Sequence, residues 1–176
     1  MASPHTLTPT DMAHLRRTIA LAAEALEAGD APFGSVLVDG AGAVLREDRN
    51  RIRTAGDGTR HPELELARWA AAHVPDAAAR KAATVYTSGE HCAMCAAAHA
   101  WVGLGRIVYV AGAAQLDGWM EEFRHEKGVE GGQVKAPVAT LPIQRVAPGI
   151  EVAGPVGELE GEIKGLHRRY AGLATP

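Results

Sequence analysis

The residues best suited to chemistry are the only two cysteines of this 176-residue chain and a histidine that precedes them. Cys92 and Cys95 stand three apart at the start of a predicted helix, so both side chains fall on one face of its first turn. His61 is followed by Pro62, which disfavours helical backbone at His61 and suits the first position of a helix. One imidazole and two thiols match a catalytic zinc site, which has three protein ligands and an open fourth position.

Glu63 lies two residues after His61 and would stand beside such a metal. A carboxylate in this position can move protons without binding the metal itself. Two other interpretations apply to the Cys-x-x-Cys pair alone. It could be a redox dithiol, or half of a structural zinc knuckle, although the sequence holds no second cysteine pair. The combination of all four residues, in this order, favours a catalytic Zn²⁺ site.

The composition is that of an ordinary globular protein, with 47% hydrophobic and 22% charged residues. We expect one domain over residues 1–176, long enough to bury a single core. Residues 1–10 have no apolar core of signal-peptide length, and the apolar stretches elsewhere carry charges, so no membrane span is expected. Two cysteines give no disulfide framework, which predicts a reducing, cytoplasmic setting.

The net charge is −3, and the chain has no basic tail. This charge disfavours, without excluding, a nucleic-acid substrate, because phosphate binding needs a basic surface. The short arginine cluster at residues 46–53 is interpreted as a solvated strand end.

Hydrophobic spacing and turn residues predict a regular alternation of helices and strands. The predicted helices are 9–28, 62–72, 92–101, 113–127 and 158–170, and the predicted strands are 33–38, 43–50, 84–87, 106–110 and 143–146. The first helix begins with Thr8 as its N-cap, Pro9 at its first position and Asp11 at the capping-box position. Segments 51–60 and 128–137 are expected to be loops. This alternation, with crossovers of helical length, implies a three-layer α/β domain.

At its candidate metal ligands the chain resembles the cytidine deaminase-like superfamily of zinc hydrolases, whose signature is His-x-Glu followed by Pro-Cys-x-x-Cys. Within the superfamily it is most similar to the branch of guanine, cytosine and tRNA-adenosine deaminases. The resemblance extends over about residues 10 to 126. It is carried by Pro32–Val38, Asn50-Arg51, Asp57-Gly58-Thr59, His61-x-Glu63, Cys92-x-x-Cys95 and Trp101.

The resemblance implies a three-layer α/β/α fold with a mixed five-stranded sheet. It also implies that His61, Cys92 and Cys95 bind Zn²⁺ and that Glu63 is the general acid and base. Asn50 would hydrogen-bond the substrate ring, and Phe33 would line the pocket or stack on that ring. Relatives are commonly homodimers, and the segment 128–176 would be a lid or a dimer contact.

Two residues depart from the family pattern. Pro62 stands where the family usually has alanine, so a backbone N–H that can contact the substrate is lost. His91 stands where the family usually has proline before the first cysteine, and we expect it to be an exposed helix cap or a polar group near the pocket mouth. The full set of candidate substrate-binding residues is Asn50, Phe33, Pro62, Glu90, His91, Glu121 and Glu122, with Glu126 as a further acidic candidate.

Residues without a motif around them are interpreted from their type and spacing. His73, His125 and His167 are expected at the surface. His99 is expected in the core or at a subunit contact. Trp119 and Phe123, four apart on one predicted helix, are expected in the core.

The leading hypothesis for the substrate is a small free ring, namely guanine, cytosine or an s-triazine such as ammeline. A second hypothesis is deamination of the wobble adenosine of tRNA, which would need a basic groove for the phosphates and a flipped base. A third hypothesis, from another class, is a zinc protein without catalytic activity.

Overall fold

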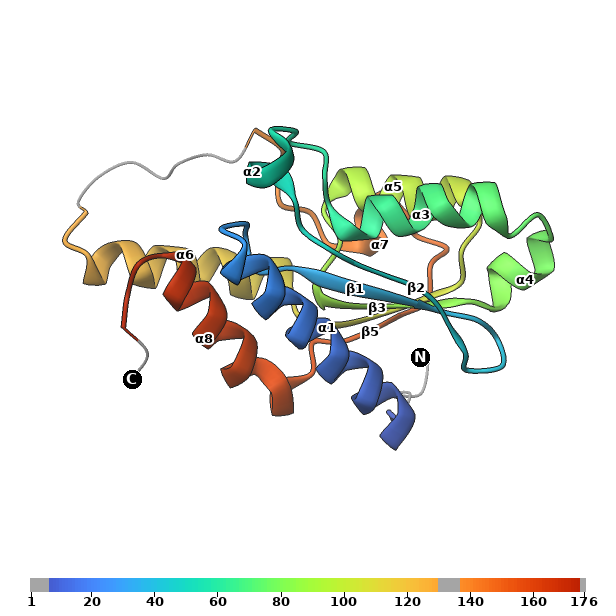
Figure 1. Ribbon diagram of the computed structural model, residues 1–176, viewed down its shortest axis with the longest axis horizontal. Helices are drawn as coiled ribbons and strands as arrows, with labels where there is room; N and C mark the ends of the chain where they lie inside the picture. Colours follow the sequence, from blue (N-terminus) through green and yellow to red (C-terminus); the bar gives the residue numbers. More distant parts are fainter. Residues whose placement is uncertain (1–6, 130–136, 175–176) are drawn as a thin grey trace.

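The computed structural model describes residues 7–129 and 137–174 and is built around one five-stranded sheet (Figure 1). Its strands are β1 (Gly34–Val38), β2 (Val44–Arg49), β3 (Thr84–Gly89), β4 (Arg106–Ala111) and β5 (Val152–Ala153). Their order across the sheet is β2-β1-β3-β4-β5. β1 pairs antiparallel with both β2 and β3, whereas β3, β4 and β5 pair in parallel. The predicted mixed five-stranded sheet is therefore confirmed.

Helices cover both faces of the sheet. They are α1 (Pro9–Glu27), α2 (Ile52–Ala55), α3 (Pro62–His73), α4 (Ala77–Ala82), α5 (Ala93–Val102), α6 (Ala113–Glu126), α7 (Ile143–Val146) and α8 (Glu160–Tyr170), with a 3₁₀ turn at Gly157–Leu159. α3 packs against α5 on one face, and α1 packs against α8 on the other (Figure 1). This is the three-layer α/β/α arrangement that the sequence predicts.

The central strands are buried on both faces, as their nearly continuous apolar sequence indicates. One core cluster lies between the sheet and α1, α6 and α8, and it contains Trp119 and Phe123 as expected. A second cluster lies between the sheet and α3 and includes Leu37, Leu66 and Val85. Within the described ranges, no helix is long and apolar enough to cross a membrane.

The first helix begins as predicted, because Thr8 and Asp11 form a capping box. The Asp11 carboxylate also accepts a hydrogen bond of 2.6 Å from the Tyr86 hydroxyl on β3, which ties the helix to the middle of the sheet. Burial opposes ionisation of Asp11, but the hydrogen bonds from Tyr86 and Thr8 outweigh it and lower the pKa of the carboxyl.

The prediction of a strand at 143–146 is wrong. This segment forms α7, which follows Pro142, and the Ile143 N–H donates to the Glu90 carboxylate at 3.0 Å. The fifth strand is instead the short β5, which pairs with β4 through Ile107 and Val108. Two short helices, α2 and α4, were not expected. Most of the predicted loop 128–137 lies outside the described residues.

The strand directions bring four chain segments to one edge of the sheet. β1 begins at this edge, just after Phe33, while β2, β3 and β4 end there. Ligands of open α/β sheets bind outside the carboxyl ends of the strands. The edge therefore gathers Phe33, Asn50 and the residues that follow Gly89.

Candidate metal centre and active site

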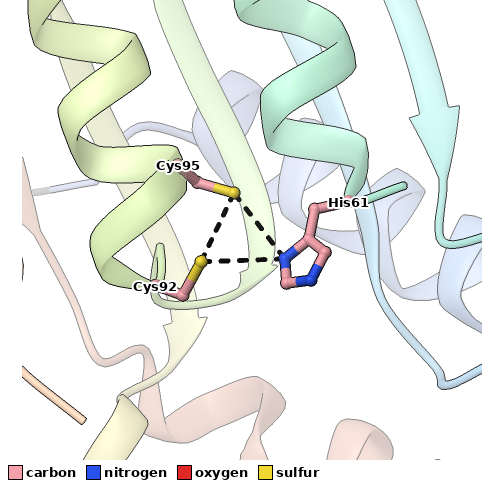
Figure 2. Close-up of side chains that lie close together, drawn as sticks. All are labelled: His61, Cys92 and Cys95. Atoms are coloured by element: carbon pink, nitrogen blue, oxygen red, sulfur yellow. Dashed lines mark hydrogen bonds between the residues drawn. The ribbon is translucent and has the colours of Figure 1, made fainter. Parts of the chain in front are cut away.

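The three predicted metal ligands meet between the first turns of α3 and α5, as Figure 2 shows. His61 Nδ1 lies 3.7 Å from Cys92 Sγ and 3.7 Å from Cys95 Sγ. The two sulfurs are 3.6 Å apart. Tetrahedral zinc, with Zn–S of about 2.3 Å and Zn–N of about 2.0–2.1 Å, places its ligand atoms about 3.6–3.8 Å from one another. The three side chains therefore fit Zn²⁺ and leave a fourth position for another ligand.

The local backbone explains why these side chains converge. His61 is extended, with φ −84° and ψ 136°, and it is the N-cap residue of α3, which Pro62 begins. Cys92 is also extended and is the N-cap residue of α5, so Cys95 lies in that helix's first turn. Two helix N-termini therefore point toward one centre. Their partial positive charges favour thiolates and other anions there.

The two thiols differ in how readily they lose a proton. The hydrogen bond between the two sulfurs, aided by His61 and opposed by burial, lowers the pKa of Cys92 to about 4. The same hydrogen bond, burial and the nearby Glu63 raise the pKa of Cys95. The Cys92 sulfur in turn raises the pKa of His61. Metal binding requires deprotonated ligands, so it must release protons from this cluster.

Glu63 is 6% exposed and is held beside the metal ligands by a chain of hydroxyl groups. The Ser35 hydroxyl donates to Thr87 Oγ1 at 2.9 Å, and the Thr87 hydroxyl donates to Glu63 Oε1 at 3.0 Å. The other oxygen, Oε2, lies 3.7 Å from Cys95 Sγ. One carboxylate oxygen is therefore anchored, and the other faces the metal ligands. Burial raises the pKa of Glu63, and His61 and Thr87 oppose this rise.

A cavity of about 510 Å³ opens beside these groups. It is lined by Phe33, Asn50, Ile52, Gly58, Thr59, His61, Pro62, Glu63, Gly89, Glu90, Cys92, Met94, Ala111, Gly112, Ala113, Leu116, Asp117, Pro137, Val138, Ala139, Thr140, Leu141 and His167. This volume is typical of a pocket for a small organic ligand. Four of the predicted substrate-binding residues line it, namely Phe33, Asn50, Pro62 and Glu90.

Asn50 and Phe33 are placed to contact a ligand in different ways. The Asn50 side-chain oxygen accepts the Ile52 N–H at 3.0 Å, so its NH₂ group remains as the side-chain donor that a ligand could use. The Phe33 ring lies over the end of β3. A Cβ atom at Gly89 would come within 2.9 Å of that ring, so glycine is needed there.

Glu90 lines the cavity, but backbone groups occupy its carboxylate. Oε2 accepts the Ala113 N–H at 2.9 Å, and Oε1 accepts the Ile143 N–H at 3.0 Å. Glu90 therefore joins the end of β3 to the starts of α6 and α7. This geometry gives it a scaffold function at the cavity wall.

The structure does not bring His91, Glu121 or Glu122 to the cavity. Glu121 and Glu122 are exposed on α6, where they lie 3.6 Å from His125 and 2.7 Å from Lys164, respectively. Glu126, the further acidic candidate, pairs with Arg168. Their charged groups face solvent because the other side of α6 carries the buried Trp119 and Phe123.

His91 is neither the exposed helix cap nor the polar group at the pocket mouth that were expected as alternatives. It is 1% exposed and packs edge-on against His99, with ring centroids 5.5 Å apart. Neither of its ring nitrogens has a hydrogen-bond partner within the part of the chain that the structure describes. Burial lowers the pKa of His91, so the ring is neutral. His99 is buried as expected, and its Nε2 bonds the Gly105 carbonyl at 3.0 Å.

The cavity lining also includes Leu116, Asp117, residues 137–141 and His167, none of which was named as a candidate, although residues 128–176 were expected to form a lid or a dimer contact. The expectation that His167 lies at the surface is wrong, because this residue is 4% exposed. Ile163 and Leu166 are buried on the same helix. The helical spacing of Ile163, Leu166 and His167 is the signal that could have placed the histidine on the inner face.

Comparison with known proteins identifies the class to which this fold and site belong. The family described as the cytidine and deoxycytidylate deaminase zinc-binding region matches residues 8–111, and the chain belongs to this family. The predicted superfamily and its zinc cofactor are therefore confirmed, and the geometry of His61, Cys92 and Cys95 agrees with both.

Individual relatives agree with this assignment. The chain is 34% identical over 103 residues to a probable cytosine deaminase of Schizosaccharomyces pombe, covering 58% of this chain and 61% of the relative. It is 37% identical over 98 residues to a guanine deaminase of Bacillus subtilis, covering 55% of this chain and 62% of the relative. The matches thus span about three-fifths of the length of these two relatives.

Solved structures show the same fold. Guanine deaminase from Nitrosomonas europaea aligns with a TM-score of 0.66 at 21% identity, covering 97% of this chain and 88% of that one. A structure from a study of tRNA:A34 deaminases aligns with a TM-score of 0.53 at 26% identity, covering 81% of this chain and 96% of that one.

Proposed function

We propose that this protein is a zinc-dependent aminohydrolase. It would remove an exocyclic amine from a small free ring, such as guanine, cytosine or an s-triazine like ammeline, and release ammonia. The observation that carries the proposal is the position of Glu63, which is buried in the cavity with Oε2 toward the three metal ligands. Two curated relatives, named as a probable cytosine deaminase and a guanine deaminase, support the reaction type.

His61, Cys92 and Cys95 would hold the zinc. When bound, Zn²⁺ supplies a Lewis acid that can lower the pKa of water to about 7. Glu63 Oε2 accepts the proton that the attacking water loses and delivers it to the ring nitrogen next to the carbon under attack. A C–O bond forms as the water's oxygen adds to the ring carbon. Glu63 then takes the remaining proton of the new hydroxyl group and gives it to the amine, the C–N bond breaks, and ammonia leaves while the ring keeps the oxygen as a carbonyl. Oε1 stays anchored by Thr87 throughout.

The charge of the cavity favours an uncharged ring. No lysine or arginine belongs to its lining among the described residues, while Glu63, Glu90 and Asp117 do. A phosphate in such a pocket would lose its hydration without gaining a cationic partner. Side chains such as Phe33, Ile52 and Leu116 supply the apolar surface that a planar ring can contact.

Deamination of the wobble adenosine of tRNA is a second candidate. It is supported by the fold shared with the tRNA:A34 deaminase structure. The cationless lining opposes it, because a flipped nucleotide brings its phosphates to the pocket mouth.

The segment 128–176 is proposed to act as a lid over the substrate, or as a dimer contact. The lid is supported by residues 137–141 and His167, which line the cavity. The homodimer, the single domain over 1–176 and the cytoplasmic location stay predictions.

Ammonia release from the purified, zinc-assayed protein tests the proposal. The panel holds guanine, cytosine, adenine, ammeline, free nucleosides and a tRNA anticodon stem-loop. Release from a free ring, lost in Glu63→Gln with zinc retained, is the expected result. Glu65→Gln is the matched control, because Glu65 lies on the same helix turn and pairs with Arg60 and Arg68 outside the cavity.

Release from the stem-loop alone would favour the second candidate. No ammonia release from any compound of the panel, with one zinc bound per chain, would contradict the proposed activity. It would support a zinc protein without catalytic activity.

A further inference from the structure

His167 reaches the cavity from the closing helix, far in sequence from the metal ligands. We propose that His167 is a substrate-contacting residue, whose imidazole hydrogen-bonds the ring and helps to select which ring is deaminated. This inference rests on the proposed function and names a specificity determinant for the same site.

The position of His167 is fixed by packing on both sides of α8. Ile163 and Leu166 are buried in the core cluster shared with α1 and α6. On the outer side, Lys164 lies 2.7 Å from Glu122, and Arg168 pairs with Glu126, so that both join α8 to α6. Exposed ion pairs contribute little one at a time, but together with the buried contacts they set the rotation of the helix. That rotation turns His167 inward.

Two aromatic rings define the surroundings of His167. Its ring lies edge-on to Phe33, with centroids 5.0 Å apart and an interplanar angle of 66°. Trp119 lies at 6.2 Å on the side of α6. Phe33 and His167 both line the cavity, so they form an aromatic corner against which a planar ring can pack.

The hydrogen-bonding capacity of His167 is unused by the protein. Neither ring nitrogen has a hydrogen-bond partner within residues 7–129 and 137–174. His167 lines the cavity, and neither nitrogen is among the fully enclosed polar atoms that lack a partner, so the ring nitrogens are open to whatever fills the cavity. Burial lowers the pKa of His167 to about 4, which keeps the ring neutral near pH 7. A neutral imidazole offers one N–H donor and one nitrogen acceptor.

These groups match the chemistry of an aminated heterocycle. Such a ring carries N–H groups, ring nitrogens and often a carbonyl on more than one edge. Asn50 offers an NH₂ donor, and His167 can both donate and accept a hydrogen bond. Glu63 accepts and donates the protons that the reaction moves at the edge under attack. Three separate elements therefore supply the few polar groups of a mostly apolar pocket, which is the usual basis of ligand orientation.

Steady-state kinetics of three variants test the inference. His167→Phe keeps the ring and its contact with Phe33 but removes both nitrogens. His167→Gln keeps a donor and an acceptor. His125→Phe is the matched control, because His125 is exposed on α6 and does not line the cavity. Each protein is also assayed for zinc content and thermal stability.

We expect His167→Phe to raise KM about tenfold, the usual effect of one lost hydrogen bond, with a smaller change in kcat and unchanged zinc. His167→Gln should recover part of the loss, and the ranking of guanine, cytosine and ammeline should change between variants. His125→Phe should behave as wild type. Wild-type KM values and an unchanged ranking in His167→Phe would overturn the inference, as would an equal loss in both phenylalanine variants.

Binding measurements separate this inference from the proposed function. Calorimetric titration of guanine, cytosine and ammeline into Glu63→Gln, with and without His167→Phe, reports contact without turnover. If the wild type releases no ammonia, the proposed function fails, and weaker binding in the double variant still supports His167 as a ligand contact. Equal binding by Glu63→Gln and by the double variant, or no binding of any ring to either protein, overturns the inference about His167. If His167→Phe does not fold, the same comparisons are made with His167→Gln and His167→Asn.

Discussion

The two sides of the cavity are built in different ways. The metal wall comprises Asn50, His61, Glu63, Cys92 and Cys95, with Phe33 beside them. The cover comprises Leu116, Asp117, residues 137–141 and His167. The family match ends at residue 111, so it contains the whole metal wall and none of the cover.

The difference lies in what holds each side in place. Helix N-termini and a buried chain of hydroxyl groups from Ser35 to Glu63 fix the metal wall. The cover depends on the packing of α6 and α8 and on exposed ion pairs, and residues 137–141 are themselves exposed. We therefore expect the metal wall to determine whether deamination occurs and the cover to determine which ring is accepted.

Cys95→Ser should have the largest effect, because it removes a metal ligand from the centre of the metal wall. We expect zinc content to fall well below one per chain and ammonia release to disappear. The melting temperature should also stop responding to added zinc, since metal bound only to the folded state stabilises it. Metal analysis and thermal unfolding in zinc or chelator check this. Full zinc content in the variant would contradict the assigned ligand set.

Glu63→Gln should abolish turnover while leaving the metal bound, which separates proton transfer from metal binding within one wall. General acid–base catalysis typically contributes about 10²–10⁴-fold, so kcat should fall by at least about 10²-fold. Ammonia release and zinc content, measured on the same sample, provide the test. A variant that keeps a tenth of the wild-type kcat would show that another group carries the protons.

Thr87→Val should have an intermediate effect on the pH profile. The Thr87 hydrogen bond lowers the pKa of Glu63, so its removal raises that pKa further. Glu63 must be ionised to accept a proton, and kcat/KM falls as the pH drops through its pKa. The acid limb of the kcat/KM profile should therefore move to higher pH, with kcat reduced about tenfold or less.

The matched control is Thr18→Val, since Thr18 is a buried threonine on α1 whose hydroxyl donates to the Leu15 carbonyl at 2.7 Å. An acid limb that moves equally in both variants, or to lower pH in Thr87→Val, would rule out the proposed anchoring of Glu63.

Leu116→Ala should have the smallest effect. It should change mainly KM, because Leu116 belongs to the cover. Loss of apolar contact with the ring should raise KM several-fold, consistent with about 1 kcal/mol for part of a leucine side chain. Zinc content and the acid limb should stay unchanged. Leu26→Ala is the control, since both leucines are half-buried against the same core cluster and Leu26 is outside the cavity lining. Equal KM changes would show that the effect is structural.

The metal wall could be predicted from sequence because its parts are local. Cys92 and Cys95 share one helix turn, and Pro62 fixes where α3 begins, so His61 is extended by necessity. Asn50 and Phe33 were expected from the family resemblance, and the structure places both where strand ends meet at one end of the sheet. The regular elements that carry these residues have strong apolar periodicity or clear caps, which is why the mixed sheet and the three layers agree with expectation.

A lid or dimer contact from residues 128–176 was expected, but the individual residues of the cover could not be predicted because their positions depend on long-range contacts. The segment of α7 has strand-like composition, but its conformation is set by Pro142 and by the Glu90 carboxylate fifty-three residues earlier. His167 is flanked by Arg168 and Arg169, so its local sequence suggests a surface residue, and the rotation of α8 against α1 and α6 decides otherwise. His91 is buried by its contact with His99, which no spacing rule reveals.

The three tryptophans of the chain differ greatly in their contact with water, and this gives the protein an internal optical readout. Trp101 on α5 is 89% exposed, whereas Trp119 on α6 is 6% exposed and lies beside His167. An ionic quencher such as iodide can therefore reach the fluorescence of Trp101 but not that of Trp119. Loss of quenching at Trp101 would signal a second subunit over α5, and a change in Trp119 emission would signal that the neighbouring cavity has filled.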